Sequence, residues 1–116
     1  MADLSIKRGD TYPPLRAQLT ERDPTSVDPR ARRAISLSGA TSVAFRAKSR
    51  DERRSFGGPC VVTDAPNGWV EWTLDPAFTQ IYDFFYGEFE IVWTSGGSQT
   101  VPNDGYFEIE IVKDLG

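Results

Sequence analysis

The sequence contains no histidine and a single cysteine, Cys60. Without histidine, the chain lacks the commonest general base, the Ser-His-Asp and Cys-His catalytic arrangements, and most zinc sites. One cysteine excludes an internal disulfide, and a lone thiol is typical of a protein made in the reducing cytosol. The composition therefore predicts a protein that is not an enzyme and that uses no metal or cofactor.

Long apolar runs are also missing, because no segment approaches the ~20 residues that a membrane-spanning helix needs. The first residues of the chain contain no apolar stretch of the secretory type, so we expect neither export nor a membrane partner. The chain has 116 residues, of which 39% are hydrophobic and 26% are charged. This length is sufficient to bury one core, which predicts a single domain over residues 1–116.

Basic residues are almost absent from the second half of the chain. Residues 59–116 hold one, Lys113, against ten acidic residues, whereas residues 1–58 hold twelve basic and seven acidic residues. The two halves therefore carry −9 and +5, and the whole chain carries −4. A net negative protein is repelled by phosphate backbones, so we expect no nucleic-acid partner. Either the halves neutralise each other within one fold, or opposite patches favour head-to-tail association between copies.

Apolar and polar residues alternate along much of the chain, which is the pattern of half-buried β-strands. Turn residues separate these runs: Pro66-Asn67-Gly68 predicts a hairpin, and Gly96-Gly97 and Asn103-Asp104-Gly105 predict further turns. The pattern predicts an all-β fold, an antiparallel Ig-like β-sandwich of about seven strands. The predicted strands lie within residues 2–7, 15–19, 43–48, 60–63, 69–74, 88–93 and 107–112.

Two segments depart from the strand pattern. Residues 21–40 are polar, contain Pro24 and Pro29, and are predicted to form a long loop. Residues 75–82 are predicted to form one short helical turn, near 76–82, with Asp75 as its N-cap and Pro76 in the first helical position. Such a turn suits a crossing from one sheet of a sandwich to the other.

Arginines are concentrated in two polar segments that we expect to meet at one end of the sandwich. The planar guanidinium group is favoured at protein interfaces, so these segments form a candidate docking surface. Two solvated loops without a partner are the alternative. The arginines concerned are Arg30, Arg32, Arg33, Arg50, Arg53 and Arg54.

Four glutamates occupy alternate strand positions, namely Glu88, Glu90, Glu108 and Glu110. If their strands share a sheet, Arg46 and Lys48 lie across from them and form an internal charge ladder. The alternative is an acidic patch that faces a basic partner. A glycosidase pair is a distant third, because it needs a carboxylic acid of raised pKa in a partly apolar cleft.

Trp69 is the remaining candidate interface residue. If Trp72 points into the core, Trp69 points outward, where it is either covered by a loop or available to a partner. The segment 81–86 is also more aromatic than one core requires, and we expect it to contribute an interface anchor. Trp69 and nearby tyrosines would suit a glycan, so a glycan- or cell-surface-binding module is the alternative function.

Several segments together resemble a known domain family. They are Ile6-Lys7-Arg8-Gly9-Asp10-Thr11, Leu37-Ser38-Gly39-Ala40-Thr41-Ser42-Val43-Ala44-Phe45-Arg46, Gly68-Trp69-Val70-Glu71-Trp72, Tyr86-Gly87-Glu88-Phe89-Glu90-Ile91 and Val101-Pro102-Asn103-Asp104-Gly105-Tyr106. In order and spacing, the chain resembles the small phage domain typified by the N-terminal domain of baseplate upper proteins. The resemblance implies an Ig-like sandwich of a tailed-phage virion, made in the host cytoplasm. It also implies an adaptor role, other virion proteins as partners and self-association into a homo-oligomer, with the place on the baseplate, tail, neck or head left open.

Overall fold

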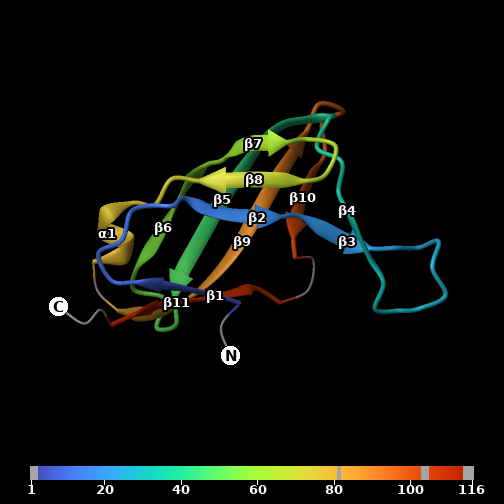
Figure 1. The fold of residues 1–116 in the computed structure, drawn as a ribbon. Helices are drawn as coiled ribbons and strands as arrows, with labels where there is room; N and C mark the ends of the chain where they lie inside the picture. Colours follow the sequence, from blue (N-terminus) through green and yellow to red (C-terminus); the bar gives the residue numbers. More distant parts are fainter. Residues whose placement is uncertain (1–2, 81, 103–104, 114–116) are drawn as a thin grey trace.

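The computed structural model describes residues 3–80, 82–102 and 105–113, which form an all-β protein with one short helix (Figure 1). The strands are β1 (Leu4–Lys7), β2 (Leu15–Gln18), β3 (Thr20–Arg22), β4 (Arg32–Ala34), β5 (Ala40–Ser49), β6 (Ser55–Pro59), β7 (Val61–Asp64), β8 (Trp69–Trp72), β9 (Asp83–Trp93), β10 (Ser98–Val101) and β11 (Phe107–Val112). The helix, α1, spans Pro76–Thr79.

The large sheet is built around the two longest strands, β5 and β9. Its order is β1-β11-β9-β5-β6, and β10 pairs with the part of β9 that β11 leaves free. Strands β1 and β11 run parallel, whereas the other pairs in this sheet are antiparallel. A smaller sheet has the order β2-β8-β7, and β3 pairs with β4 in a separate ribbon.

The core lies between the large sheet and the smaller three-stranded sheet. The ring of Phe45 in β5 lies 4.7 Å from the ring of Trp72 in β8, so the two sheets meet through these side chains. Phe78 of α1 closes one end, with its ring 5.4 Å from Trp72 and 4.7 Å from Phe85. Inward and outward residues alternate along both sheets, and this alternation gives the fold its sandwich-like character.

The all-β prediction is confirmed, and each of the seven predicted runs overlaps a strand. The structure adds four strands, β3, β4, β6 and β10, to the seven expected. These strands have three to five residues and lack an apolar alternation of their own. Their strand conformation comes from pairing with a neighbour, which a local pattern does not record.

Residues 21–40 are not one long loop, so that prediction is wrong. Within them, β3 and β4 pair antiparallel with Glu21 opposite Arg33, and the ribbon extends away from the sandwich (Figure 1). We call residues 20–34 the arm. Its strands are polar because their side chains are exposed or half-buried, and this polarity gave them the appearance of a loop.

The predicted turns at two places are confirmed. Residues 65–68 connect β7 to β8, and Gly68 has a φ of +75°. A Cβ at Gly68 would lie 2.7 Å from the carbonyl oxygens of Leu19 and Ile35. Both this close approach and the positive φ therefore require glycine at position 68. Gly96 and Gly97 connect β9 to β10. The predicted turn at Asn103-Asp104 lies outside the described residues.

The helical turn begins as predicted, because the Asp75 carboxylate accepts a hydrogen bond of 2.9 Å from the Ala77 amide and Pro76 occupies the first helical position. The helix ends at Thr79, earlier than the predicted residue 82. Ile81 lies outside the described residues.

Candidate functional site

The two arginine segments lie at opposite ends of the sandwich, so the predicted single basic surface is wrong. Arg32 and Arg33 are in β4, which precedes the start of β5, whereas Arg50 follows the end of β5. A strand of ten residues spans ~33 Å. Figure 1 shows β4 and the arrowhead of β5 on opposite sides of the molecule. The length of β5, which the arginine spacing does not reveal, separates the segments.

Within the arm, Arg32 and Arg33 bind neighbours in the same ribbon. Arg33 Nε lies 3.0 Å from Glu21 Oε2, and Arg32 donates a hydrogen bond of 2.7 Å to the carbonyl of Thr20. Arg30 forms no ion pair with any described residue. Near the tip of the arm, the Arg30 guanidinium therefore has no ion-pair partner among the described residues.

In the loop after β5, Arg54 Nη2 lies 2.5 Å from Asp83 Oδ2, and its guanidinium also lies over the Phe85 ring at 5.2 Å. This ion pair ties the loop to the beginning of β9. Arg50 lies 4.6 Å from the centroid of the Phe84 ring and has no carboxylate partner among the described residues. Arg53 is exposed and likewise lacks a described ion pair.

The charge ladder is confirmed in part. Arg46 lies directly opposite Glu88, and its Nη2 is 4.0 Å from Glu88 Oε1 and 3.2 Å from Glu90 Oε2. Lys48, however, lies opposite Tyr86 and forms no ion pair with a described residue. In this register Glu88 lies opposite Arg46 and Glu90 lies opposite Ala44, so neither glutamate is the cross-strand partner of Lys48.

Glu108 and Glu110 do not meet the basic residues of β5. Glu108 lies opposite Tyr86 and Glu110 lies opposite Phe84, because β9 runs between β5 and β11. Neither glutamate forms an ion pair with a described residue. The ladder prediction is therefore wrong for these two, which remain on the outer face as uncompensated carboxylates.

Trp69 points outward from β8, as predicted, whereas Trp72 is buried. The guanidinium of Arg16 in β2 lies 4.4 Å from the Trp69 ring, so an arginine rather than a loop covers it. Trp69 lies on the outer side of the smaller sheet. The structure does not bring it together with Tyr86 and Tyr106, which belong to the large sheet's outer side.

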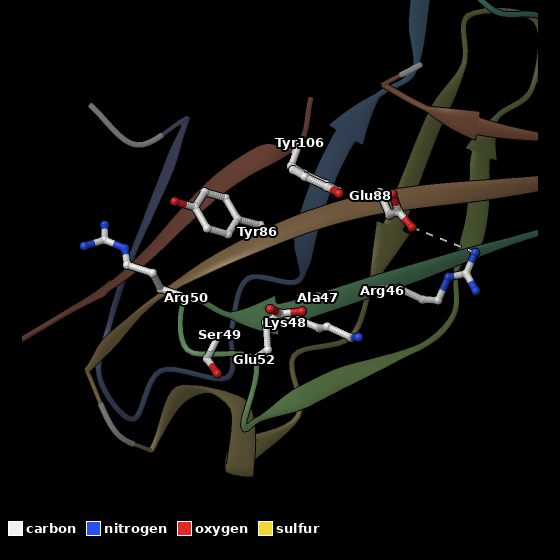
Figure 2. A pocket seen from close by; sticks show the side chains of 9 residues that line it. All are labelled: Arg46, Ala47, Lys48, Ser49, Arg50, Glu52, Tyr86, Glu88 and Tyr106. Atoms are coloured by element: carbon white, nitrogen blue, oxygen red, sulfur yellow. Dashed lines mark ion pairs between the residues drawn. The ribbon is translucent and has the colours of Figure 1, made fainter. Parts of the chain in front are cut away.

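A pocket of about 510 Å³ lies on the outer face of the large sheet (Figure 2). The end of β5 and its following loop form one wall, and β9 and Tyr106 form the other. Pockets that hold small ligands have ~300–1,000 Å³. The lining residues are Arg46, Ala47, Lys48, Ser49, Arg50, Glu52, Tyr86, Glu88 and Tyr106.

Two tyrosines form the aromatic part of this pocket. The ring centroids of Tyr86 and Tyr106 are 5.9 Å apart, and Tyr106 is 59% exposed. Sequence reasoning placed Lys48 in the charge ladder rather than in a pocket, and it did not name Tyr106 as a candidate site residue. The alternation of Arg46, Lys48 and Arg50 along the chain indicates that these three side chains share the outer face of the sheet. Tyr106 lies beside them only because of the order of the strands in the sheet.

Cys60 lies between β6 and β7 and is half-buried. Burial raises the pKa of its thiol to about 11, so the sulfur is protonated at neutral pH and is a weak nucleophile. Across residues 3–80, 82–102 and 105–113, no three His, Cys, Asp or Glu side chains gather closely enough to hold a metal ion.

No protein-family model matches the chain, and no curated protein matches it either. Among the described residues, no helix has both the length and the hydrophobicity needed to cross a bilayer.

Proposed function

We propose that this chain is a non-enzymatic structural or adaptor protein of a tailed-phage virion, an Ig-like β-sandwich that self-associates and docks to neighbouring virion proteins. The arm carries this proposal. It extends away from the sandwich and ends in a loop (Figure 1). The Val27 side chain in this loop is fully exposed. An apolar side chain displayed on a projecting ribbon suits insertion into a neighbouring protein.

The arm is held in shape without help from a partner. The Asp23 carboxylate accepts hydrogen bonds from the amide and hydroxyl of Thr25, at 2.9 and 2.6 Å. Asp28 accepts one of 2.9 Å from the Arg30 amide, and the Asp23 amide donates one of 2.9 Å to Ala31. A loop that is ordered before binding loses less conformational entropy on docking, which favours a tight interface.

The charges near the arm suggest the chemistry of the docking surface. Arg30 lacks an ion-pair partner within the described chain, so it favours a carboxylate on the neighbour. Glu108 and Glu110 display such carboxylates on the large sheet. A second copy is therefore a suitable neighbour, and a contact between unlike surfaces produces rings or filaments.

The test combines Val27→Asp with Arg30→Glu. Both side chains are exposed, so the variant folds with an unchanged melting temperature. We expect its incorporation into virus particles to fall by at least ~10-fold, which corresponds to ~1.4 kcal/mol of lost contact. Sedimentation of the purified chain then shows whether the same change also reduces self-association.

The matched control combines Val61→Asp with Arg53→Glu, which alters the same residue types at exposed positions outside the arm. This control is expected to be incorporated normally. If the arm variant enters particles as efficiently as the unchanged chain, docking through the arm is excluded.

A further inference from the structure

The pocket on the outer face of the large sheet contains no residue of the arm, and its lining points to a small ligand. We propose that it binds a carboxylated sugar unit of an acidic polysaccharide. The proposal rests on three features that the fold brings together: a pair of tyrosine rings, two cations without ion-pair partners among the described residues, and carboxylates beside them (Figure 2).

The tyrosines provide a surface for the apolar face of a sugar ring. Tyr86 projects from β9, and Tyr106 comes from the segment before β11. The planes of the two rings are inclined by 46° to each other, and both rings border the pocket. A tyrosine offers both an apolar ring and a hydroxyl, which matches a pyranose with its C–H face and its hydroxyl groups.

The cations provide a place for a carboxylate. Lys48 and Arg50 project from the same side of β5 and its end, and both are exposed. Neither forms an ion pair with a described residue, whereas Arg46 in the same pocket is already neutralised by Glu88 and Glu90. The positive charge that no described carboxylate neutralises therefore belongs to Lys48 and Arg50, whose side chains extend in different directions in Figure 2. Either cation can give a ligand carboxylate charge-assisted hydrogen bonds.

The acidic residues of the pocket favour a sugar with one carboxylate over a ligand that carries several negative charges. Glu52 and Glu88 also line the pocket, and their oxygens accept hydrogen bonds from hydroxyl groups. The same carboxylates repel a second negative charge in the ligand. A phosphate or a run of acidic peptide residues is disfavoured for this reason, whereas a ligand with one carboxylate and several hydroxyls matches each part of the lining.

The experiment titrates 3′-sialyllactose, a trisaccharide with a single carboxylate, into the ¹⁵N-labelled full chain and follows amide shifts by NMR. We expect saturable shifts that are concentrated at Lys48, Arg50, Tyr86 and Tyr106. Maltotriose, a neutral trisaccharide of the same length, is expected to bind at least ~10-fold more weakly, since it lacks the charge-assisted contact.

Two variants test the assigned contacts. Lys48→Gln removes a cation and Tyr106→Ala removes a ring, and each is expected to weaken sialyllactose binding ~10-fold without unfolding the chain. Arg30→Gln and Tyr82→Ala are the matched controls, because they remove an exposed cation and an exposed tyrosine outside the pocket. Both controls are expected to retain the full affinity.

Absence of saturable shifts, or shifts away from the pocket, would overturn the proposal. Equal binding of maltotriose would exclude carboxylate recognition, and equal binding of a short poly-glutamate would assign the pocket to an acidic peptide instead. The arm variant leaves the pocket unchanged, so the docking proposal and the sugar proposal fail independently.

Discussion

The ring of Phe45 packs over Gly87 of the neighbouring strand in the space that a side chain at position 87 would occupy. A Cβ added to Gly87 would lie 2.9 Å from Phe45 Cε1, closer than a real Cβ contact. Both residues are buried. The glycine in the longest strand therefore gives Phe45 room to contact Phe89, at 5.2 Å between ring centroids, and Trp72 of the opposite sheet.

We expect Gly87→Ala to destabilise the protein by ~1–3 kcal/mol, the usual cost of overpacking a core. The added carbon would also lie 3.1 Å from Ile109 Cδ1, so the ring of Phe45 has little freedom to move aside. Urea unfolding followed by tryptophan fluorescence measures the change. Gly97→Ala is the control, since nothing lies within 4 Å of a Cβ there. Equal unfolding midpoints for the two variants would show that Gly87 is not needed for packing.

Removing the N-cap of α1 tests whether this single turn contributes to stability. Asp75→Ala deletes the acceptor for the Ala77 amide and is expected to cost ~1 kcal/mol. Asp75→Asn keeps an acceptor oxygen and is expected to leave the melting temperature almost unchanged. A loss as large in the asparagine variant as in the alanine variant would argue against the capping role.

The thiol of Cys60 is expected to react slowly with a disulfide reagent. Because burial raises its pKa to about 11, its thiolate fraction at pH 8 is ~100-fold or more below that of an ordinary thiol. The labelling rate should rise ~10-fold per pH unit between pH 8 and 10 and become fast in urea. A Cys60→Ser, Ser98→Cys double variant moves the thiol to an exposed position as the control. Similar rates at both positions would contradict the shifted pKa.

The loop after β5 is expected to respond to acid through Asp51. Hydrogen bonds from the Ser49 hydroxyl, at 2.6 Å, and from the Arg53 amide lower the pKa of the Asp51 carboxyl. A lowered pKa means that these hydrogen bonds are present at neutral pH and are lost only as the pH falls below the ordinary value of ~3.9.

An NMR titration of the carboxyl carbons measures this effect. We expect Ser49→Ala to move the pKa of Asp51 upward, toward its ordinary value. Asp23 is the internal control, because its pKa is lowered by hydrogen bonds from Thr25 and is independent of Ser49. An unchanged Asp51 pKa in the variant would rule out the hydroxyl as the main cause.

Much of the strand content was predictable because burial on one face of a sheet is recorded locally. In β9 and β11, every second residue packs inward, so apolar residues recur with a period of two. The Asp75 cap was predictable for the same reason, since the capping carboxylate and the amide it binds are two residues apart.

Strand β6 shows where local prediction ends. It contains Gly57, Gly58 and Pro59, which are poor strand formers. Gly57 is required by its neighbour, because a Cβ there would lie within van der Waals overlap of the Phe45 carbonyl oxygen. The strand thus depends on the backbone of β5, which approaches it only after the sheet has formed.

The sequence by itself determined the all-β class, the approximate positions of seven strands and the positions of two turns, because these depend on neighbouring residues. Only the tertiary structure decided which charges meet. Strand order places β9 between Lys48 and Glu108, and the length of β5 separates Arg33 from Arg50. The same order brings Lys48 and Tyr106, distant in the chain, into one pocket. These relationships arise from pairing across the sheet, where contacts between distant residues set the register.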